Sequence, residues 1–265
     1  HKIRYNSPLL SHDFQPSYCS HPRCLVISMN LLLLEPADFT SDLRVTLGGR
    51  RLQHLLEIHR VSEGATLRVG LVNGQMGEAT VLRLTPQAAE LAVVLNQPPP
   101  PALPVTLILA MPRPKMLRRI LQTVATMGVK QLYLINSWRV EKSYWQSPWL
   151  APEAIREQLL LGLEQGCDTQ LPCVLSRTRF KPFVEDELPN IVANSLALVA
   201  HPGGNAPCPA DLQTAPVTLA IGPEGGFIDY EIQKLCEAGF QPVTLGSRIL
   251  RVETAIPVIL GRLFH

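Results

Sequence analysis

The sequence between Leu219 and Ala255 contains two glycine-rich turns, and each turn directly follows a short apolar run. The first turn, 222–226, reads GPEGG, and the second, 246–248, reads GSR. Glycine tolerates positive φ and lets a ligand approach the bare backbone closely. Apolar residues at helical spacing fill the stretch between the turns, so the order is strand, loop, helix, strand, loop, helix. In open α/β sheets, ligands bind at the carboxyl ends of such strands, so the segment predicts a ligand site.

Capping residues set the expected ends of the two helices in this segment. Asp229 is the expected N-cap of the first helix, and Gly239 is its expected stop. Thr254 is expected to cap the last helix, with Pro257 in its first turn, where a missing N–H costs little.

A proline-rich stretch at 98–104 divides the chain and predicts a stiff linker. Before it, 29–97 shows β-like runs and an Asn73-Gly74 hairpin turn, whereas 105–265 alternates strand and helix signals in a parallel α/β order. In the first domain we expect strands at 31–34, 45–47, 66–71, 78–84 and 90–95, and a helix at 51–59. In the second we expect strands at 105–109, 129–135, 173–175, 196–200, 219–221 and 242–245, and helices from 115 and over 152–165.

We interpret residues 1–28 as a leader or an expression remnant, because they start at His1 and precede Met29. A transit peptide is a weaker alternative, since this stretch holds three Lys or Arg residues. No apolar run approaches the ~20 residues of a membrane span, so we expect a soluble, cytoplasmic protein, or an organellar one if the leader is a transit peptide. With 46% hydrophobic content, the 265 residues can bury one large core or two modest ones.

The cysteines do not indicate a metal site or a disulfide framework. Cys19, His21 and Cys24, even with His12, match no standard zinc module. We therefore expect no metal and interpret the others as thiols of a reducing compartment. They are Cys167, Cys173, Cys208 and Cys236.

Net charge does not indicate a nucleic-acid partner. Without the leader the chain has 21 basic and 21 acidic residues, so any RNA-binding role depends on clustering. Either a solvated surface or a phosphate-contacting face would explain the clusters. They comprise Arg44, Arg50, Arg51, His54, His59, Arg60 and Arg68 in the first domain, and Arg113, Lys115, Arg118 and Arg119 in the second.

The motifs GPEGG, LGSRIL and RVETA resemble, in order and spacing, the C-terminal signature of the ribosomal small-subunit RNA uridine-N3 methyltransferases of the SPOUT superfamily. LVAHPG at 198–203 is similar to a third loop of that family. The resemblance implies a trefoil-knotted α/β domain with a parallel sheet at 105–265, preceded by a small PUA-like β-barrel at 29–97. It also implies a homodimer that binds S-adenosylmethionine and methylates N3 of a uridine in 16S-type ribosomal RNA.

The resemblance also assigns expected roles to individual residues. Cofactor-binding residues are Leu198, His201, Gly203, Ile221, Gly222, Gly225, Gly226, Leu245, Gly246, Ser247, Ile249, Leu250 and Thr254. RNA-binding residues are Arg50, His54, Arg60, Lys115, Arg118 and Arg139.

Arg251 is the expected catalytic cation, because its guanidinium stays charged and could stabilise a uridine anion. An ion pair with Glu224 or Glu253 is the alternative reading of this residue. Either carboxylate could act as a base or could cap backbone N–H groups. His201 is expected to contribute its backbone, and the aromatic residues Trp138, Tyr144, Trp145 and Trp149 are expected to pack a core or interface rather than to stack on bases.

Three departures from the family pattern raise a competing hypothesis. Thr123 and Thr126 stand where Lys and Glu are usual, and Ile228 displaces a hydroxyl cap. Where the family continues Glu-Gln with an Arg-containing turn, Glu164 and Gln165 lead to Gly166-Cys167-Asp168. A catalytically silent RNA-binding protein that keeps the knotted fold for dimerisation is therefore the alternative. A nucleotide-binding oxidoreductase fails because the chain has no GxGxxG after a strand.

Overall fold

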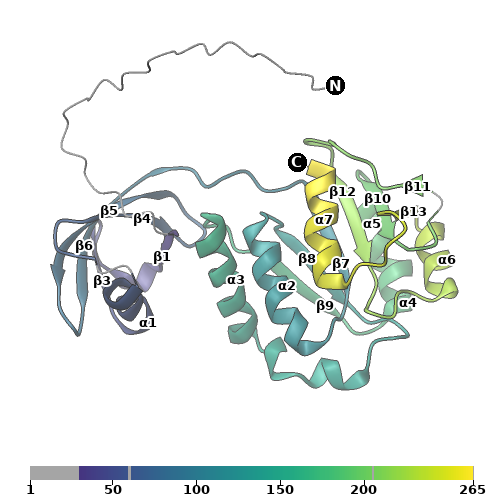
Figure 1. Ribbon diagram of the computed structural model, residues 1–265, viewed down its shortest axis with the longest axis horizontal. Coiled ribbons are helices and arrows are strands. Elements are labelled where there is room, and N and C mark those ends of the chain that lie inside the picture. The colour runs from purple at the N-terminus through teal and green to yellow at the C-terminus, as the bar shows by residue number, and fades with distance from the viewer. Residues whose placement is uncertain (1–29, 59–60, 205, 265) are drawn as a thin grey trace, which may run out of the picture.

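The computed structural model describes residues 30–58, 61–204 and 206–264, which form two lobes, each built on its own sheet (Figure 1). The expected leader and its cysteines lie outside the described residues, as do His59 and Arg60.

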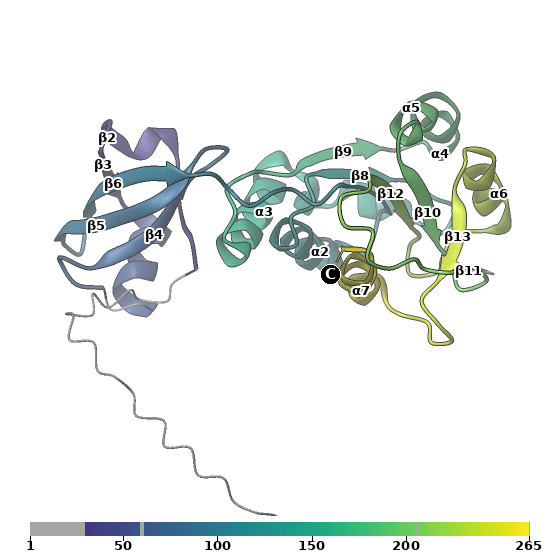
Figure 2. The same cartoon turned by 90° about the horizontal axis from the view of Figure 1, so that it is seen from above.

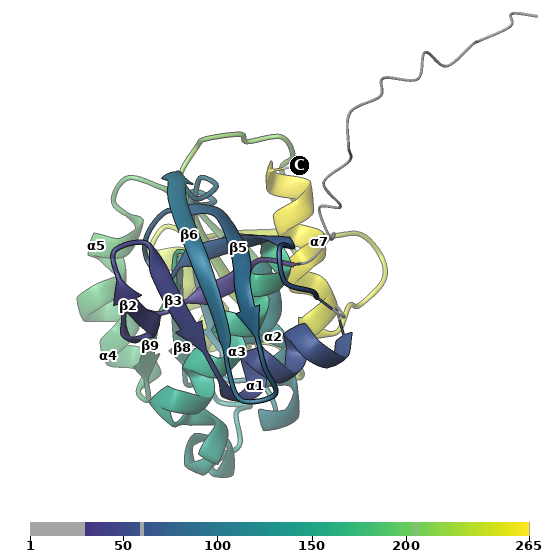
Figure 3. The same cartoon turned by 90° about the vertical axis from the view of Figure 1, so that its left-hand side faces the viewer.

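The first lobe contains a six-stranded sheet in the order β1-β4-β5-β6-β3-β2. β1 runs parallel to β4, and the other neighbours are antiparallel. Figure 3 shows β3, β5 and β6 side by side at one end of the molecule. The strands are β1 (Leu32–Leu34), β2 (Phe39–Ser41), β3 (Arg44–Leu47), β4 (Thr66–Leu71), β5 (Met76–Leu84) and β6 (Ala89–Gln97). The helical pieces are η1 (Pro36–Asp38), α1 (Gly49–Gln53) and the π-helical η2 (His54–Ile58).

The second lobe contains seven parallel strands in the order β11-β13-β10-β12-β7-β8-β9. The central strands β7 and β12 are apolar and buried along nearly their whole length, as expected when helices cover both faces of a sheet. Figure 2 shows α2, α3 and α7 on one face and α4 and α5 on the other. The strands are β7 (Val105–Ala110), β8 (Gln131–Ile135), β9 (Cys173–Arg177), β10 (Leu196–Ala200), β11 (Ala206–Pro207), β12 (Val217–Ile221) and β13 (Gln241–Thr244). The helices are α2 (Pro114–Thr126), η3 (Lys142–Gln146), η4 (Pro148–Leu150), α3 (Pro152–Gly166), α4 (Phe180–Pro182), η5 (Phe183–Glu187), α5 (Leu188–Val192), α6 (Asp229–Glu237) and α7 (Val252–Phe264).

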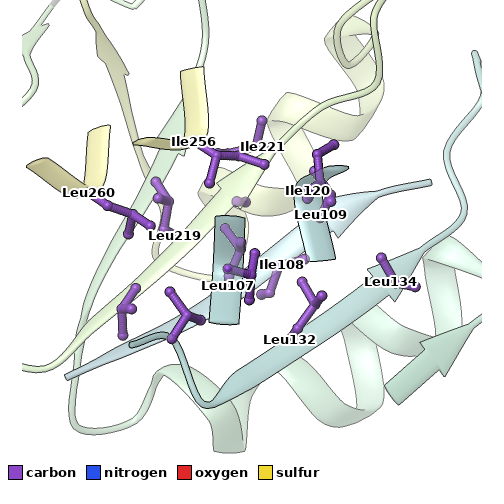
Figure 4. Packing of buried hydrophobic residues seen from close by; sticks show 14 of the residues in the cluster. Leu107, Ile108, Leu109, Ile120, Leu132, Leu134, Leu219, Ile221, Ile256 and Leu260 are labelled. Carbon is purple, nitrogen blue, oxygen red and sulfur yellow. The ribbon is translucent and has the colours of Figure 1, made fainter. Parts of the chain in front are cut away.

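Helix α7 packs against the middle of the second sheet. Its buried Ile256 and Leu260 lie beside Leu219 and Ile221 of β12 (Figure 4). Because β13 lies near one edge of the sheet, residues 245–251 must return toward its centre before α7 begins. This return places the segment beside the loop that follows β12.

The two expected N-caps, Asp229 and Thr254, are wrong. Ile228, not Asp229, is the N-cap of α6, because the buried Glu231 carboxylate accepts the Ile228 N–H at 3.0 Å and replaces a polar cap. Helix α7 begins before Thr254, since the Arg251 carbonyl accepts the N–H groups of Thr254 and Ala255 at 3.0 and 2.8 Å. Pro257 therefore lies inside this helix.

The short helices between residues 180 and 192 were not expected from the sequence. Pro182 and Pro189 interrupt the apolar periodicity there, although Phe183 and Leu188 are fully buried. Tertiary burial rather than a periodic local signal stabilises these turns.

The two lobes are joined by apolar and polar contacts. Leu31, Leu33 and Met76 of the first lobe belong to the core of the second. The guanidinium of Arg156 on α3 makes a bidentate pair with Glu35 at 3.0 and 2.9 Å. These contacts fix how the first lobe sits beside α3.

Candidate active site

Three loops at the carboxyl ends of adjacent strands enclose a cavity of ≈ 180 Å³. The loops follow β10, β12 and β13, which are neighbours in the sheet although residues 201–216 separate two of them in sequence. The cavity is lined by Ala200, His201, Pro202, Ile221, Gly222, Pro223, Glu224, Gly226, Val243, Thr244, Leu245, Gly246, Ser247, Arg248, Ile249, Leu250, Val252 and Ala255.

Backbone geometry explains the glycines of this cavity. A Cβ on Gly222 would lie 2.9 Å from the backbone nitrogen of Phe227, so a side chain there would force the loop open. Gly226 and Gly246 have φ values of +72° and +119°, which L side chains rarely adopt. The cavity therefore depends on main-chain shape.

Most of the expected cofactor residues line this cavity, and four do not. Leu198 is buried within β10, and Gly203 lies past His201 on the outer part of its loop. Gly225 lies under Arg139, whose guanidinium donates to the Gly225 carbonyl oxygen. Thr254 is exposed in the first turn of α7. Of the lining residues that the sequence did not identify, all but Val243 directly adjoin expected ones in the chain: Ala200, Pro202, Pro223, Thr244, Arg248, Val252 and Ala255.

Two hydrogen bonds hold the backbone of His201. Its N–H donates to the Val243 carbonyl at 3.0 Å, and its carbonyl accepts the Gly204 N–H at 2.9 Å. These bonds fix the wall of the cavity between β10 and β13.

A second, more open groove of ≈ 720 Å³ adjoins the cavity and shares Glu224 with it. All three expected catalytic residues line this groove. The sequence did not indicate that the start of α2 or Tyr144 would join them, because these elements are far apart in the chain. The groove is lined by Arg113, Pro114, Lys115, Met116, Tyr144, Glu224, Arg251 and Glu253.

The charged groups in the groove differ in how they are held. The Glu224 carboxylate accepts the backbone N–H of Arg113 at 3.0 Å, at the N-terminus of α2. No ion pair between described residues includes Arg251, Glu224 or Glu253, so the alternative in which Arg251 only pins a turn has no support in the described contacts. The exposed Arg251 guanidinium is therefore available to a ligand.

The expected RNA-binding residues have different local environments. Lys115 lines the groove, whereas the Arg118 guanidinium lies 4.1 Å from the centre of the Trp149 ring. Arg50 pairs with Glu164 at 3.4 Å, and His54 lines a pocket between the lobes. Arg139 is bound to the Gly225 carbonyl, and Arg60 lies outside the described residues.

The unusual residues of the second lobe have structural partners away from the groove. Buried Asp168 pairs with Lys130 at 2.5 Å and accepts the Gln170 N–H at 2.9 Å. The hydroxyl of Thr126 donates to the Gly162 carbonyl at 3.0 Å, and that of Thr123 bonds within α2. None of these three residues lines the cavity or the groove.

The described part of the chain contains neither a group of metal ligands nor a membrane-spanning helix. None of its His, Cys, Asp and Glu residues form a group that could hold a metal ion. None of its helices combines the length and hydropathy that crossing a membrane requires.

Comparisons with known proteins place this geometry in a family. A family model described as an RNA methyltransferase domain matches residues 99–263. A ribosomal RNA small subunit methyltransferase E from Synechocystis sp. is 30% identical over 226 residues, covering 83% of this chain and 72% of the relative. A protein of the same name from Treponema pallidum is 29% identical over 233 residues, covering 86% and 87%. The structure of the Neisseria gonorrhoeae protein of that name, bound to S-adenosyl methionine, has the same fold, with a TM-score of 0.67 at 23% identity over 87% of this chain and 95% of that one.

Proposed function

This chain belongs to the ribosomal RNA small subunit methyltransferase E family of RNA methyltransferases, and on that premise we propose that it methylates N3 of a uridine in small-subunit ribosomal RNA. S-Adenosylmethionine is the methyl donor. The observation that carries the proposal is that a backbone-built cavity and a charged groove share Glu224. A donor in the first and a base in the second would meet beside this residue. A ribosomal RNA substrate supports the expected cytoplasmic location and also fits an organellar one.

The residues of the cavity suit an adenosyl group. Apolar side chains of Ile221, Leu245, Ile249 and Leu250 can cover its apolar surface, while the glycine turns let it approach the main chain. Bound S-adenosylmethionine supplies an electrophilic methyl group. The loops after β10, β12 and β13 would hold the cofactor, which would supply this methyl group to a base in the adjoining groove.

The groove suits a uridine whose N3 must lose a proton. Arg251 stabilises the negative charge that develops on the base, because no ion pair between described residues occupies its guanidinium. Glu253 accepts the N3 proton, whereas Glu224 already accepts the Arg113 N–H and positions the loop. Since N3 lies on the Watson–Crick edge, the target base is unpaired or flipped out of a helix.

The finer architecture is also part of the proposal. A trefoil knot in the second lobe is supported by the return of residues 245–251 from the β13 edge to the centre of the sheet. A PUA-like barrel that holds RNA is supported by the mixed six-stranded sheet with its own core. A homodimer is supported by large apolar side chains left exposed on the second lobe, with Trp138 80% and Val258 44% accessible.

Calorimetric titration with S-adenosylmethionine tests the cofactor site. The parent is expected to bind, and Gly226→Trp is expected to abolish binding by filling the cavity. Gly239→Trp is the matched control, because Gly239 also has positive φ and open space but does not line the cavity. Failure of the parent to bind, or equal loss in both variants, would contradict the proposed site.

A further inference from the structure

The four aromatic residues between 138 and 149 have different environments. The Trp145 indole N–H donates to the Asn136 side chain at 2.9 Å, and Trp149 lies under the Arg118 guanidinium. Trp138 is 80% exposed and lines neither cavity. Tyr144, Trp145 and Trp149 pack against the core of the second lobe, as expected, and among the four only Tyr144 also lines the groove.

The Tyr144 ring is held in place without a ligand. It packs against the core of the second lobe, and its hydroxyl donates to the Glu141 carboxylate at 3.1 Å. Its own N–H donates to the Glu141 carbonyl at 3.0 Å. A ring fixed before binding loses little conformational freedom when a ligand arrives.

The groove around Tyr144 is lined by two kinds of groups, apolar and charged. Pro114 and Met116 are its other apolar lining residues, and Tyr144 is the one aromatic side chain among the described residues that line it. Arg113, Lys115 and Arg251 supply positive charge, and Glu253 supplies a carboxylate. A nucleobase has the same division, with two apolar faces and a polar edge.

We propose that Tyr144 is the stacking platform for the target uridine, with its ring against one face of the base and Met116 as a further apolar contact. This inference deepens the proposed function and rests on it. The stacking orients the base so that its N3 edge is presented to Glu253 and Arg251. Tyr144 is therefore a substrate-positioning residue that determines affinity for the RNA, not for the cofactor.

The phenol of Tyr144 does not compete for the role of base. Burial, together with the hydrogen bond to Glu141, raises the pKa of Tyr144 above its ordinary value. The hydroxyl therefore stays protonated at neutral pH, and its contribution is the face of the ring.

The inference can be tested by steady-state assays of methyl transfer to small-subunit ribosomal RNA. The assays compare the parent with Tyr144→Phe and Tyr144→Leu. Phe keeps the ring, so its KM for RNA should stay within about twofold of the parent. Leu keeps apolar bulk but removes the ring, so the KM should rise roughly tenfold or more, as for the loss of one base–aromatic stack. Tyr230→Leu is the control, because Tyr230 is a tyrosine of the second lobe that is 47% exposed and lines neither cavity.

Cofactor titration and thermal unfolding of the same variants separate stacking from folding. Stacking predicts that Tyr144→Leu keeps the parent's Kd for S-adenosylmethionine and its Tm. The inference is overturned if Tyr144→Leu matches Tyr230→Leu in KM, or if cofactor binding and Tm fall together with activity. A parent that transfers no methyl group contradicts the proposed function itself, which is a different result from an active parent insensitive to Tyr144.

Discussion

The cofactor cavity and the adjacent groove are built in opposite ways. The cavity is shaped by main chain from three loops at the ends of neighbouring strands, all within residues 200–255. The groove is formed by side chains from the start of α2, from η3, from the loop after β12 and from the start of α7. A local glycine pattern can specify the first, whereas only the complete fold assembles the second. Substitutions in the cavity should therefore affect cofactor binding, whereas substitutions in the groove should affect RNA binding or the methyl-transfer step.

Among these variants, Arg251→Ala should lower kcat the most. It therefore tests most strongly whether the cavity and the groove have different roles. Loss of a preorganised positive group at the developing anion should lower kcat about 10²- to 10³-fold. The Kd for S-adenosylmethionine should not change, because Arg251 does not line the cavity. Arg251→Lys, which keeps the charge, should recover part of the rate in single-turnover assays. A parallel loss of cofactor binding would break the division.

The next largest loss of kcat should come from Glu253→Gln, and Glu224→Gln should not share it. Removing the base should lower kcat about 10²-fold, the low end for a general base. Glu224→Gln should stay near the parent, because the amide oxygen can still accept the Arg113 N–H. A pH–rate profile of both variants provides the measurement. Equal losses would show that the two carboxylates act as one unit.

Ile249→Ala should have a modest effect that is confined to the cavity. Ile249 is 82% exposed without a ligand, so its contribution is apolar area covered when the cofactor binds. Removing a few methyl and methylene groups should weaken cofactor binding roughly threefold to tenfold. Val94→Ala, at a 57% exposed position in the first lobe, is the control in the same titration. A loss as large as that of Gly226→Trp would mean that side chains, not main chain, build the cavity.

Glu187→Gln should have the smallest effect, a minor loss of folding stability. It serves as a control for the variants of the cavity and of the groove. The hydrogen bond from Arg177 lowers the pKa of Glu187, so this pair stabilises the fold at neutral pH and loses its contribution as acid protonates Glu187. The pair is about one third exposed, so the variant should lose less than about 1 kcal/mol at pH 7. Denaturant titrations at pH 7 and near pH 2 should show the difference disappearing in acid. Altered cofactor binding in this variant would be unexpected.

The cavity could be predicted from the sequence because its signals are local. Glycine turns after apolar runs identified the loops after β12 and β13, whereas the family resemblance supplied the thirteen individual cofactor residues, nine of which line the cavity. Thr254 was misplaced because Arg251, one turn earlier, caps α7 through its backbone rather than its side chain. Such a cap has no residue signature.

The groove could be predicted only in part. Arg251, Glu224 and Glu253 belong to the same motifs as the cavity, so they were expected. Tyr144 and Met116 lie on elements that reach the groove through the strand order and the packing of α2, which no local pattern records. For the same reason the basic residues predicted a shared RNA surface, whereas several of them have protein partners.

Nucleoside mass spectrometry of the product tests the central claim most directly. Small-subunit ribosomal RNA lacking base methylation would be incubated with the parent chain and S-adenosylmethionine, then digested and separated. The account predicts 3-methyluridine from a single site, formed about 10²- to 10³-fold more slowly with Arg251→Ala. A methyl group on another atom or base, or no methylation by a parent that binds the cofactor, would contradict it.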